Sequence, residues 1–89
     1  MKAKGVFVLR HIMDEYILMP TGENISKFKG TILLNEVSAF LWEKLQKPVS
    51  REDLLTALLD EYEVDPETAG RDLDATLEKF RSFSVIEDE

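Results

Sequence analysis

Residues 30–42, GTILLNEVSAFLW, decide how the rest of the chain folds. The first half of this segment contains a threonine, an isoleucine and two leucines, which is typical of a short β-strand. The second half has the spacing of an amphipathic helix, with Val37, Phe40 and Leu41 on one stripe. Asn35 lies at the junction, and asparagine is among the best residues for capping a helix N-terminus. The segment therefore predicts a strand that leads directly into a helix.

Two further strands are predicted before this segment. They are the apolar run at residues 6–13 and the shorter run at residues 16–19, which ends at a proline. We place a two-residue hairpin turn between them at residues 14–15. A polar stretch, residues 21–29, is predicted to form a loop before the third strand at residues 30–34.

Three helices are predicted after the segment. The first covers residues 36–46 and ends before Pro48. The second begins at a capping box formed by Ser50 and Asp53. The third begins at Asp65 as N-cap, with a proline at the first helical position. Strands followed by helices predict an α+β domain, in which the helices pack on one face of a small three-stranded antiparallel sheet.

The sequence also predicts how several single residues pack in or near the core. Trp42 lies off the main stripe of its helix and is assigned to packing. Gly70 lies inside the third helix, where glycine costs about 0.8–1 kcal/mol relative to alanine. Close packing or a groove beside Gly70 would explain why a glycine stands there. Neutral sequence variation within a family is the other explanation. Phe83, Val85 and Ile86 are expected to fold back on the core.

Composition and charge limit the possible functions. The 89 residues are expected to form one domain, with no cysteine for a disulfide or a thiolate metal site. Residues 36–89 carry a net charge of −9, which disfavours binding to a phosphate backbone. No apolar run approaches the roughly 20 residues that span a bilayer. We expect a cytoplasmic protein without membrane or nucleic-acid partners.

No group of residues predicts catalysis or metal binding. His11 is the only histidine, and no cysteine or clustered carboxylates accompany it. We therefore expect a protein with no catalytic residues, no metal and no cofactor. An edge strand offers unpaired N–H and C=O groups, so the best candidate site is the edge of the third strand beside the third helix. Along this strand, Thr31 and Leu33 should share one face while Ile32 and Leu34 share the other.

Four motifs resemble the PqqD-like family, which is named for a protein of pyrroloquinoline quinone biosynthesis. Together they extend the resemblance over nearly the whole chain, from about residue 6 to residue 86. The motifs are FVLR at residues 7–10, ILLNEVSAFLW at 32–42, the leucine, glutamate and tyrosine pattern at 54–62, and DL followed by leucine at 72–77.

The resemblance implies a non-enzymatic binding protein with a winged-helix-like fold. Members of the family bind the leader of a ribosomal precursor peptide as an added strand and present it to a modifying enzyme, often a radical S-adenosylmethionine enzyme. Asp72 is assigned to the site from the family, whereas its three helical neighbours in the site follow from helical geometry. The complete predicted peptide-binding set is Lys29, Gly30, Thr31, Ile32, Leu33, Leu34, Asp72, Ala75, Thr76 and Lys79.

Two other functions stay open from the residues alone. A winged-helix DNA-binding regulator has similar elements, but its third helix should be basic. Residues 65–84 instead carry five acidic and three basic residues, so this alternative ranks well below peptide binding. A small accessory subunit of an enzyme is the third possibility.

Overall fold

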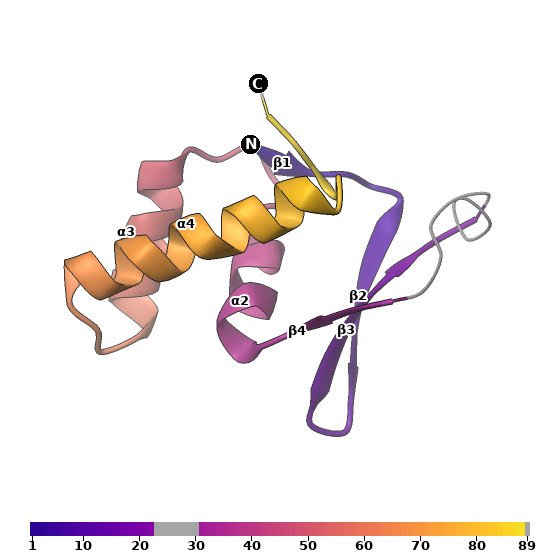
Figure 1. The fold of residues 1–89 in the computed structure, drawn as a ribbon, viewed down its shortest axis with the longest axis horizontal. Helices are drawn as coiled ribbons and strands as arrows, with labels where there is room; N and C mark the ends of the chain where they lie inside the picture. The colour runs from indigo at the N-terminus through magenta and orange to yellow at the C-terminus, as the bar shows by residue number, and fades with distance from the viewer. Residues whose placement is uncertain (23–30, 89) are drawn as a thin grey trace.

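The computed structural model describes residues 1–22 and 31–88 of the chain. A three-stranded antiparallel sheet in the order β2-β3-β4 precedes three helices, which confirms the predicted α+β fold (Figure 1). The predicted site residues Lys29 and Gly30, and most of the predicted loop, lie outside the described residues. The elements of the main sheet and of the helices are β2 (Phe7–Ile12), β3 (Glu15–Pro20), β4 (Ile32–Leu34), α2 (Glu36–Lys44), α3 (Arg51–Glu61) and α4 (Pro66–Ser82).

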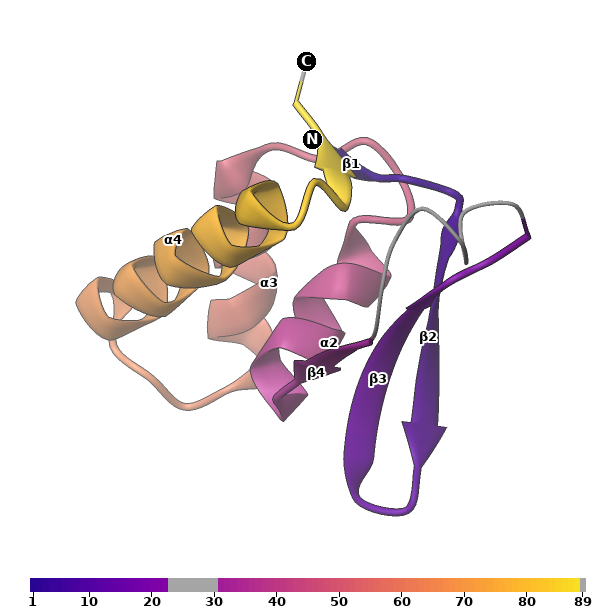
Figure 2. The same cartoon turned by 45° about the vertical axis from the view of Figure 1, so that its right-hand side comes forward.

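The β2–β3 hairpin extends away from the helices, while β4 leads straight into α2 (Figure 1). Turning the molecule shows that α4 packs with α3 beside α2 (Figure 2). The two chain ends meet in a second sheet, which the sequence did not predict. It pairs β1 (Lys2–Ala3) antiparallel with β5 (Ile86–Glu87). This small sheet holds the N-terminal segment against the end of α4.

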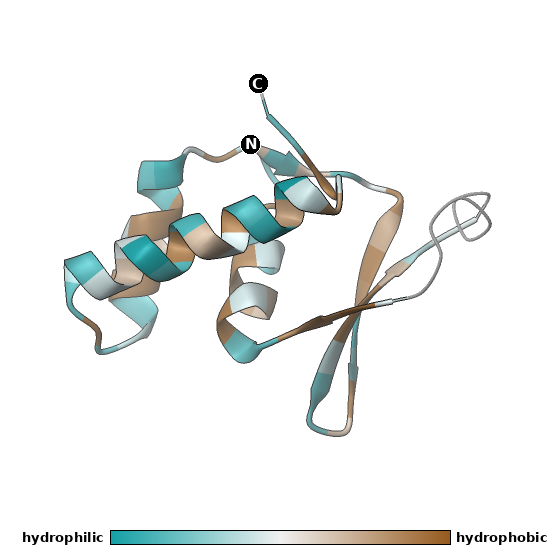
Figure 3. Cartoon of the chain, viewed as in Figure 1, coloured by the Kyte–Doolittle hydropathy of each residue, from teal (hydrophilic) through white to brown (hydrophobic). Residues whose placement is uncertain are grey.

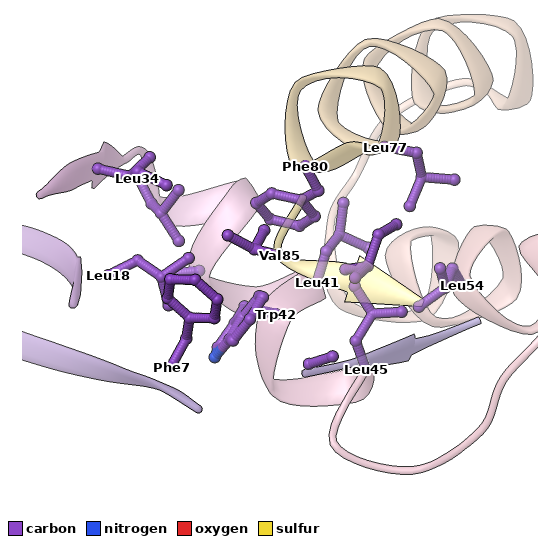
Figure 4. Close-up of a cluster of buried hydrophobic side chains, with 14 of the residues drawn as sticks. Phe7, Leu18, Leu34, Leu41, Trp42, Leu45, Leu54, Leu77, Phe80 and Val85 are labelled. Atoms are coloured by element: carbon purple, nitrogen blue, oxygen red, sulfur yellow. The ribbon is translucent and has the colours of Figure 1, made fainter. Parts of the chain in front are cut away.

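The core lies between the helices and the inner face of the sheet. Leu41 and Leu45 of α2 are fully buried, and Trp42 is 2% exposed. The Trp42 ring packs edge to face on Phe80 of α4, with 5.6 Å between the ring centroids. Side chains from the sheet, the helices and the C-terminal segment meet around this pair (Figure 4). The packing role predicted for Trp42 is confirmed.

The helix starts follow the sequence signals with one difference. Asn35 Oδ1 accepts a hydrogen bond from the Ser38 backbone N–H at 2.7 Å, and the capping box at Ser50 is formed in both directions. Asp65 occupies the N-cap position of α4, but its side chain makes no cap hydrogen bond. A hydrogen bond from the side chain of Thr68 lowers the pKa of Asp65 instead. The predicted start of α4, with Asp65 at the N-cap position and Pro66 after it, is thus confirmed, although no cap hydrogen bond from the Asp65 side chain forms.

The hairpin turn lies one residue earlier than predicted. Ile12 pairs with Glu15, so the turn consists of Met13 and Asp14 rather than residues 14–15. Met13 has a φ of 56°, and the primed turns that fit two-residue hairpins need a positive φ at the first central position. The observed register keeps Leu18, which is fully buried, on the core face of β3.

The C-terminal segment folds back as predicted, except at Phe83. Val85 is fully buried and Ile86 is 6% exposed, whereas Phe83 is 40% exposed. The chain reverses after α4 at Ser84, which has a φ of 56°. This reversal turns Val85 and Ile86 into the core and leaves Phe83, at the end of the helix, on the surface.

Candidate functional site

The β4 strand lies at one edge of the sheet, and the hairpin register determines which of its backbone groups face outward. The pair Ile12–Glu15 closes a two-residue hairpin, so these residues exchange hydrogen bonds. Backbone groups along β3 then alternate between its two neighbours, and those of Ile17 point toward β2. Leu33 lies opposite Ile17 in β4. The N–H and C=O of Leu33 therefore point away from β3, toward the free edge.

A side-chain contact independently supports this orientation. Lys79 Nζ donates a hydrogen bond to the Leu33 carbonyl oxygen at 3.0 Å. Because Lys79 belongs to α4, the free edge of β4 faces this helix. Lys79 and Leu33, both in the predicted site, therefore contact each other at this edge.

Side chains of β4 alternate between the core and the surface. Ile32 is 4% exposed and Leu34 is 6% exposed, whereas Leu33 is 59% exposed and Thr31 also lies on the surface. The predicted division of the strand into two faces is confirmed. Most of β4 is coloured as hydrophobic in Figure 3, and the apolar side chain that this strand presents to solvent is that of Leu33.

A hollow of about 230 Å³ continues the free edge toward the start of α2. Three predicted site residues of α4 line it, namely Asp72, Ala75 and Thr76. Thr76 is only 9% exposed, so it forms the floor of the hollow rather than a protruding wall. Of the predicted site residues, the structure thus brings Leu33 together with Lys79, and it places Asp72, Ala75 and Thr76 around the hollow.

Two residues that sequence reasoning did not assign to the site, Asn35 and Val37, also line this hollow. The cap hydrogen bond of Asn35 fixes the sharp change from β4 to α2, which places its side chain at the hollow. Val37 is half-buried and belongs to the apolar stripe of α2. Helical periodicity assigned it to the core, and only the packing of α4 against α2 shows that part of it stays accessible.

A smaller cavity of about 70 Å³ adjoins the hollow and shares Val37 and Asp72 with it. Tyr62 lines this cavity, and burial together with the nearby Glu36 carboxylate raises the pKa of Tyr62. The cavity is mostly apolar: its lining residues are Val37, Leu58, Tyr62, Val64, Ala69 and Asp72.

Larger hollows lie elsewhere, but the predicted site residues do not line them. One, of about 320 Å³, is lined by Phe7, Val8 and Leu9 of β2 and by Trp42 and Glu43 of α2. Another, of about 490 Å³, is lined by residues of the chain ends and of the α2–α3 connection, including Met1 and Arg81. Arg81 is already paired with Asp88 at 3.0 Å. Within residues 1–22 and 31–88, no three metal-binding side chains gather, and no helix is long and apolar enough to cross a bilayer. The β4 edge is the candidate site.

Comparison with known proteins agrees with the fold and the motifs. The sequence model of the family described as coenzyme PQQ synthesis protein D (PqqD) matches residues 15–86. The chain belongs to the PqqD family. The resemblance inferred from the sequence motifs is thereby confirmed. No curated protein sequence is significantly similar to this PqqD-family chain.

Two solved structures share the fold of this PqqD-family protein. TbiB1, determined in complex with the TbiA(beta) leader peptide, is 27% identical with a TM-score of 0.78, and the match covers 100% of this chain and 98% of TbiB1. A lasso peptide synthetase B1, complexed with its leader peptide, is 21% identical with a TM-score of 0.70. That match covers 91% of this chain and 89% of the synthetase chain, and it supports the fold alone.

Proposed function

We propose that this PqqD-family protein binds the leader segment of a precursor peptide as an additional strand on β4 and presents it to a modifying enzyme. The observation that carries the proposal is the outward-facing backbone of Leu33 beside a hollow formed with α4. The same fold occurs in TbiB1, which was determined with a leader peptide bound. In this proposal the protein contributes binding and no catalytic residue or cofactor of its own.

The added strand runs antiparallel to β4. In such a pair, Leu33 exchanges both of its backbone hydrogen bonds with one peptide residue, and alternation gives Thr31 the next outward-facing pair. The proposed site also includes Lys29 and Gly30, which directly precede Thr31 in the sequence. Ile32 and Leu34 have a different role, because their backbone groups bind β3 and their side chains fill the core.

Side-chain recognition takes place in the hollow against α4. Each edge hydrogen bond contributes only about 0.5–1.5 kcal/mol net, and such bonds are made with any peptide sequence. Burial of an apolar leader side chain adds roughly 25 cal/mol per Å² and discriminates among sequences. Ala75 and Thr76 are small, Val37 supplies apolar surface, and Asp72 lies at the rim. The hollow thus selects an apolar side chain of moderate size.

The partner enzyme favoured by the family resemblance is a radical S-adenosylmethionine enzyme. Binding by strand addition leaves the part of the peptide outside the added strand free, so that part can reach a separate active site. The two walls of the groove hold only the leader. A binding protein of this kind needs no metal or cofactor, in keeping with a sequence that has no cysteine and one histidine.

The proposal is tested by selecting binders from a displayed library of random 12-residue peptides and mapping the enriched peptide by amide chemical shifts. We expect shifts at residues 31–34 and 72–79. Shifts confined to β2 or α3, or the absence of any enriched peptide, would refute the proposal. A parallel titration with fluorescent duplex DNA should show no salt-sensitive binding at sub-micromolar concentration, because the helical half is strongly acidic.

A further inference from the structure

Lys79 binds a backbone carbonyl, that of Leu33, with which an added strand would have to pair. Its ammonium group donates to the Leu33 carbonyl oxygen at 3.0 Å, and that carbonyl faces the free edge. A peptide strand paired with Leu33 must donate its own N–H to the same oxygen. The contact protects an edge strand from pairing with other chains, since edges are usually covered or charged in stable proteins. It must also give way when a peptide binds.

The ammonium of Lys79 is available for a new partner once it is displaced. In the part of the chain that the structure describes, the two ion pairs are Arg51–Asp74 and Arg81–Asp88, and Lys79 belongs to neither. Its hydrogen-bond acceptor is a neutral carbonyl. A carboxylate is a stronger partner for an ammonium group than a carbonyl, because both groups are then charged.

We propose that Lys79 exchanges partners on binding: it leaves the Leu33 carbonyl to the peptide backbone and pairs with an acidic side chain of the peptide. This inference rests on the proposed function and specifies its substrate class. The peptides bound are those with an aspartate or glutamate on the side of the added strand that faces α4. Lys79 then has two roles. Without a peptide it binds the Leu33 carbonyl at the edge, and with a peptide it selects leaders that carry an acidic side chain.

Geometry fixes where the acidic residue lies relative to the apolar residue in the hollow. From Ala75 to Lys79 the helix rises by about 6 Å, or four residues. Two residues of a β-strand rise by about 6.7 Å, and side chains two positions apart face the same side. An apolar side chain beside Ala75 therefore places the next side chain on that face beside Lys79.

The strand direction determines the order of these two peptide residues. The hollow adjoins the C-terminal end of β4, at Asn35 and Val37, while Lys79 contacts Leu33 further back along the strand. In an antiparallel addition, the N-terminal part of the peptide lies at the C-terminal end of β4. The apolar residue thus comes first, and the acidic residue follows two positions later. The residue between them lies opposite Leu33, with its side chain on the outer face of the sheet.

The test uses the same displayed 12-residue library with three proteins: the unaltered chain, Lys79→Glu and Lys47→Glu. Lys47→Glu makes the same charge change at an exposed residue of the α2–α3 connection, away from the groove. The unaltered chain and Lys47→Glu should enrich peptides with an acidic residue two positions after an apolar one. Lys79→Glu should enrich a basic residue at that acidic position. Thermal melting of each variant checks that it is folded.

Synthetic peptides with glutamate or lysine at the selected position then give the size of the effect by fluorescence anisotropy. Charge reversal at Lys79 should weaken binding of the glutamate peptide about five- to twentyfold. Lys79→Glu should bind the lysine peptide with most of the lost affinity restored. An unchanged acidic preference in Lys79→Glu, or no charge preference in the unaltered chain, would overturn the role of Lys79 while leaving strand addition intact. Failure of all three proteins to enrich any peptide would instead reject the proposed function and this inference with it.

Discussion

Substituting proline for Leu33 tests the orientation of the β4 edge directly. Proline has no backbone N–H, so it is tolerated in a sheet only where that N–H faces away from the neighbouring strand. The Leu33 N–H points outward, and its side chain is 59% exposed. Leu33→Pro should therefore fold. Ile32→Pro should be much less stable than Leu33→Pro, because it removes a hydrogen bond to β3 and a side chain that is only 4% exposed.

The expected magnitudes differ between the two substitutions. Leu33→Pro removes one hydrogen bond to the added peptide, worth about 0.5–1.5 kcal/mol, which weakens binding about two- to tenfold. Ile32→Pro should lower the free energy of unfolding by about 2–5 kcal/mol, through loss of core packing and of a ladder bond. For a chain of 89 residues this is a large part of a total stability of roughly 5–13 kcal/mol.

Thermal denaturation and fluorescence anisotropy with a selected peptide separate these effects. Leu33→Ala is the matched control, because it shortens the same side chain and keeps the N–H. We expect Leu33→Ala to bind more tightly than Leu33→Pro, with similar melting temperatures for the two variants. If Leu33→Pro unfolds while Ile32→Pro melts normally, the register argument is refuted. If Leu33→Pro folds and binds as well as Leu33→Ala, the peptide does not pair with this edge.

Three further substitutions test the local structure by thermal or denaturant unfolding. Asn35→Ala should destabilise the fold by about 0.5–2 kcal/mol, because Asn35 Oδ1 caps α2 at the Ser38 N–H, and an unchanged melting temperature would reject this capping role. Gly70→Ala should stabilise the fold by about 0.5–1 kcal/mol, since the nearest contact of an added Cβ is the flexible end of Arg51 at 3.4 Å. A lower melting temperature would show that Arg51 cannot move aside for the added methyl group. A hydrogen bond from Arg51 lowers the pKa of Asp74. A lowered carboxyl pKa contributes stability above its ordinary value of 3.8, so Asp74→Asn should lower the melting temperature at pH 7, and the difference should vanish as the pH falls well below 3.8.

Local sequence signals predicted most of the fold because each of them acts within one turn or one strand. The cap at Asn35 and the capping box at Ser50 depend on residues three positions away. The β1–β5 pair depends on contacts between the two ends of the chain, across more than 80 residues, and no local pattern reports them. Phe83 was assigned to the core because it is apolar, but the position of the chain reversal at Ser84 decides its burial.

The candidate site was only partly predictable, because the direction of its backbone groups depends on a register. The sequence placed the hairpin turn one residue too late, and a shift of one residue exchanges the groups that face β2 and β4. From that turn, the outward-facing residue of β4 could not be derived. Helical geometry selected Ala75, Thr76 and Lys79 of α4, and the family resemblance supplied Asp72. The burial of Thr76 and the participation of Val37 depend on how closely α4 approaches α2.

The sheet has a second edge at β2, and the differences between the edges explain why β4 suits a peptide better. At the start of β2, the chain satisfies an outward-facing group itself, because the Phe7 N–H binds the Lys4 carbonyl. Further along, the tip of the hairpin extends away from the helices (Figure 1), and the hollow between β2 and α2 reaches only Phe7, Val8 and Leu9. At β4, α4 reaches the edge at Leu33 through Lys79 and supplies both this cation and a hollow beyond the end of the strand. Backbone pairing alone binds any extended peptide, whereas pairing beside α4 couples it to side-chain recognition, which selection of one leader requires.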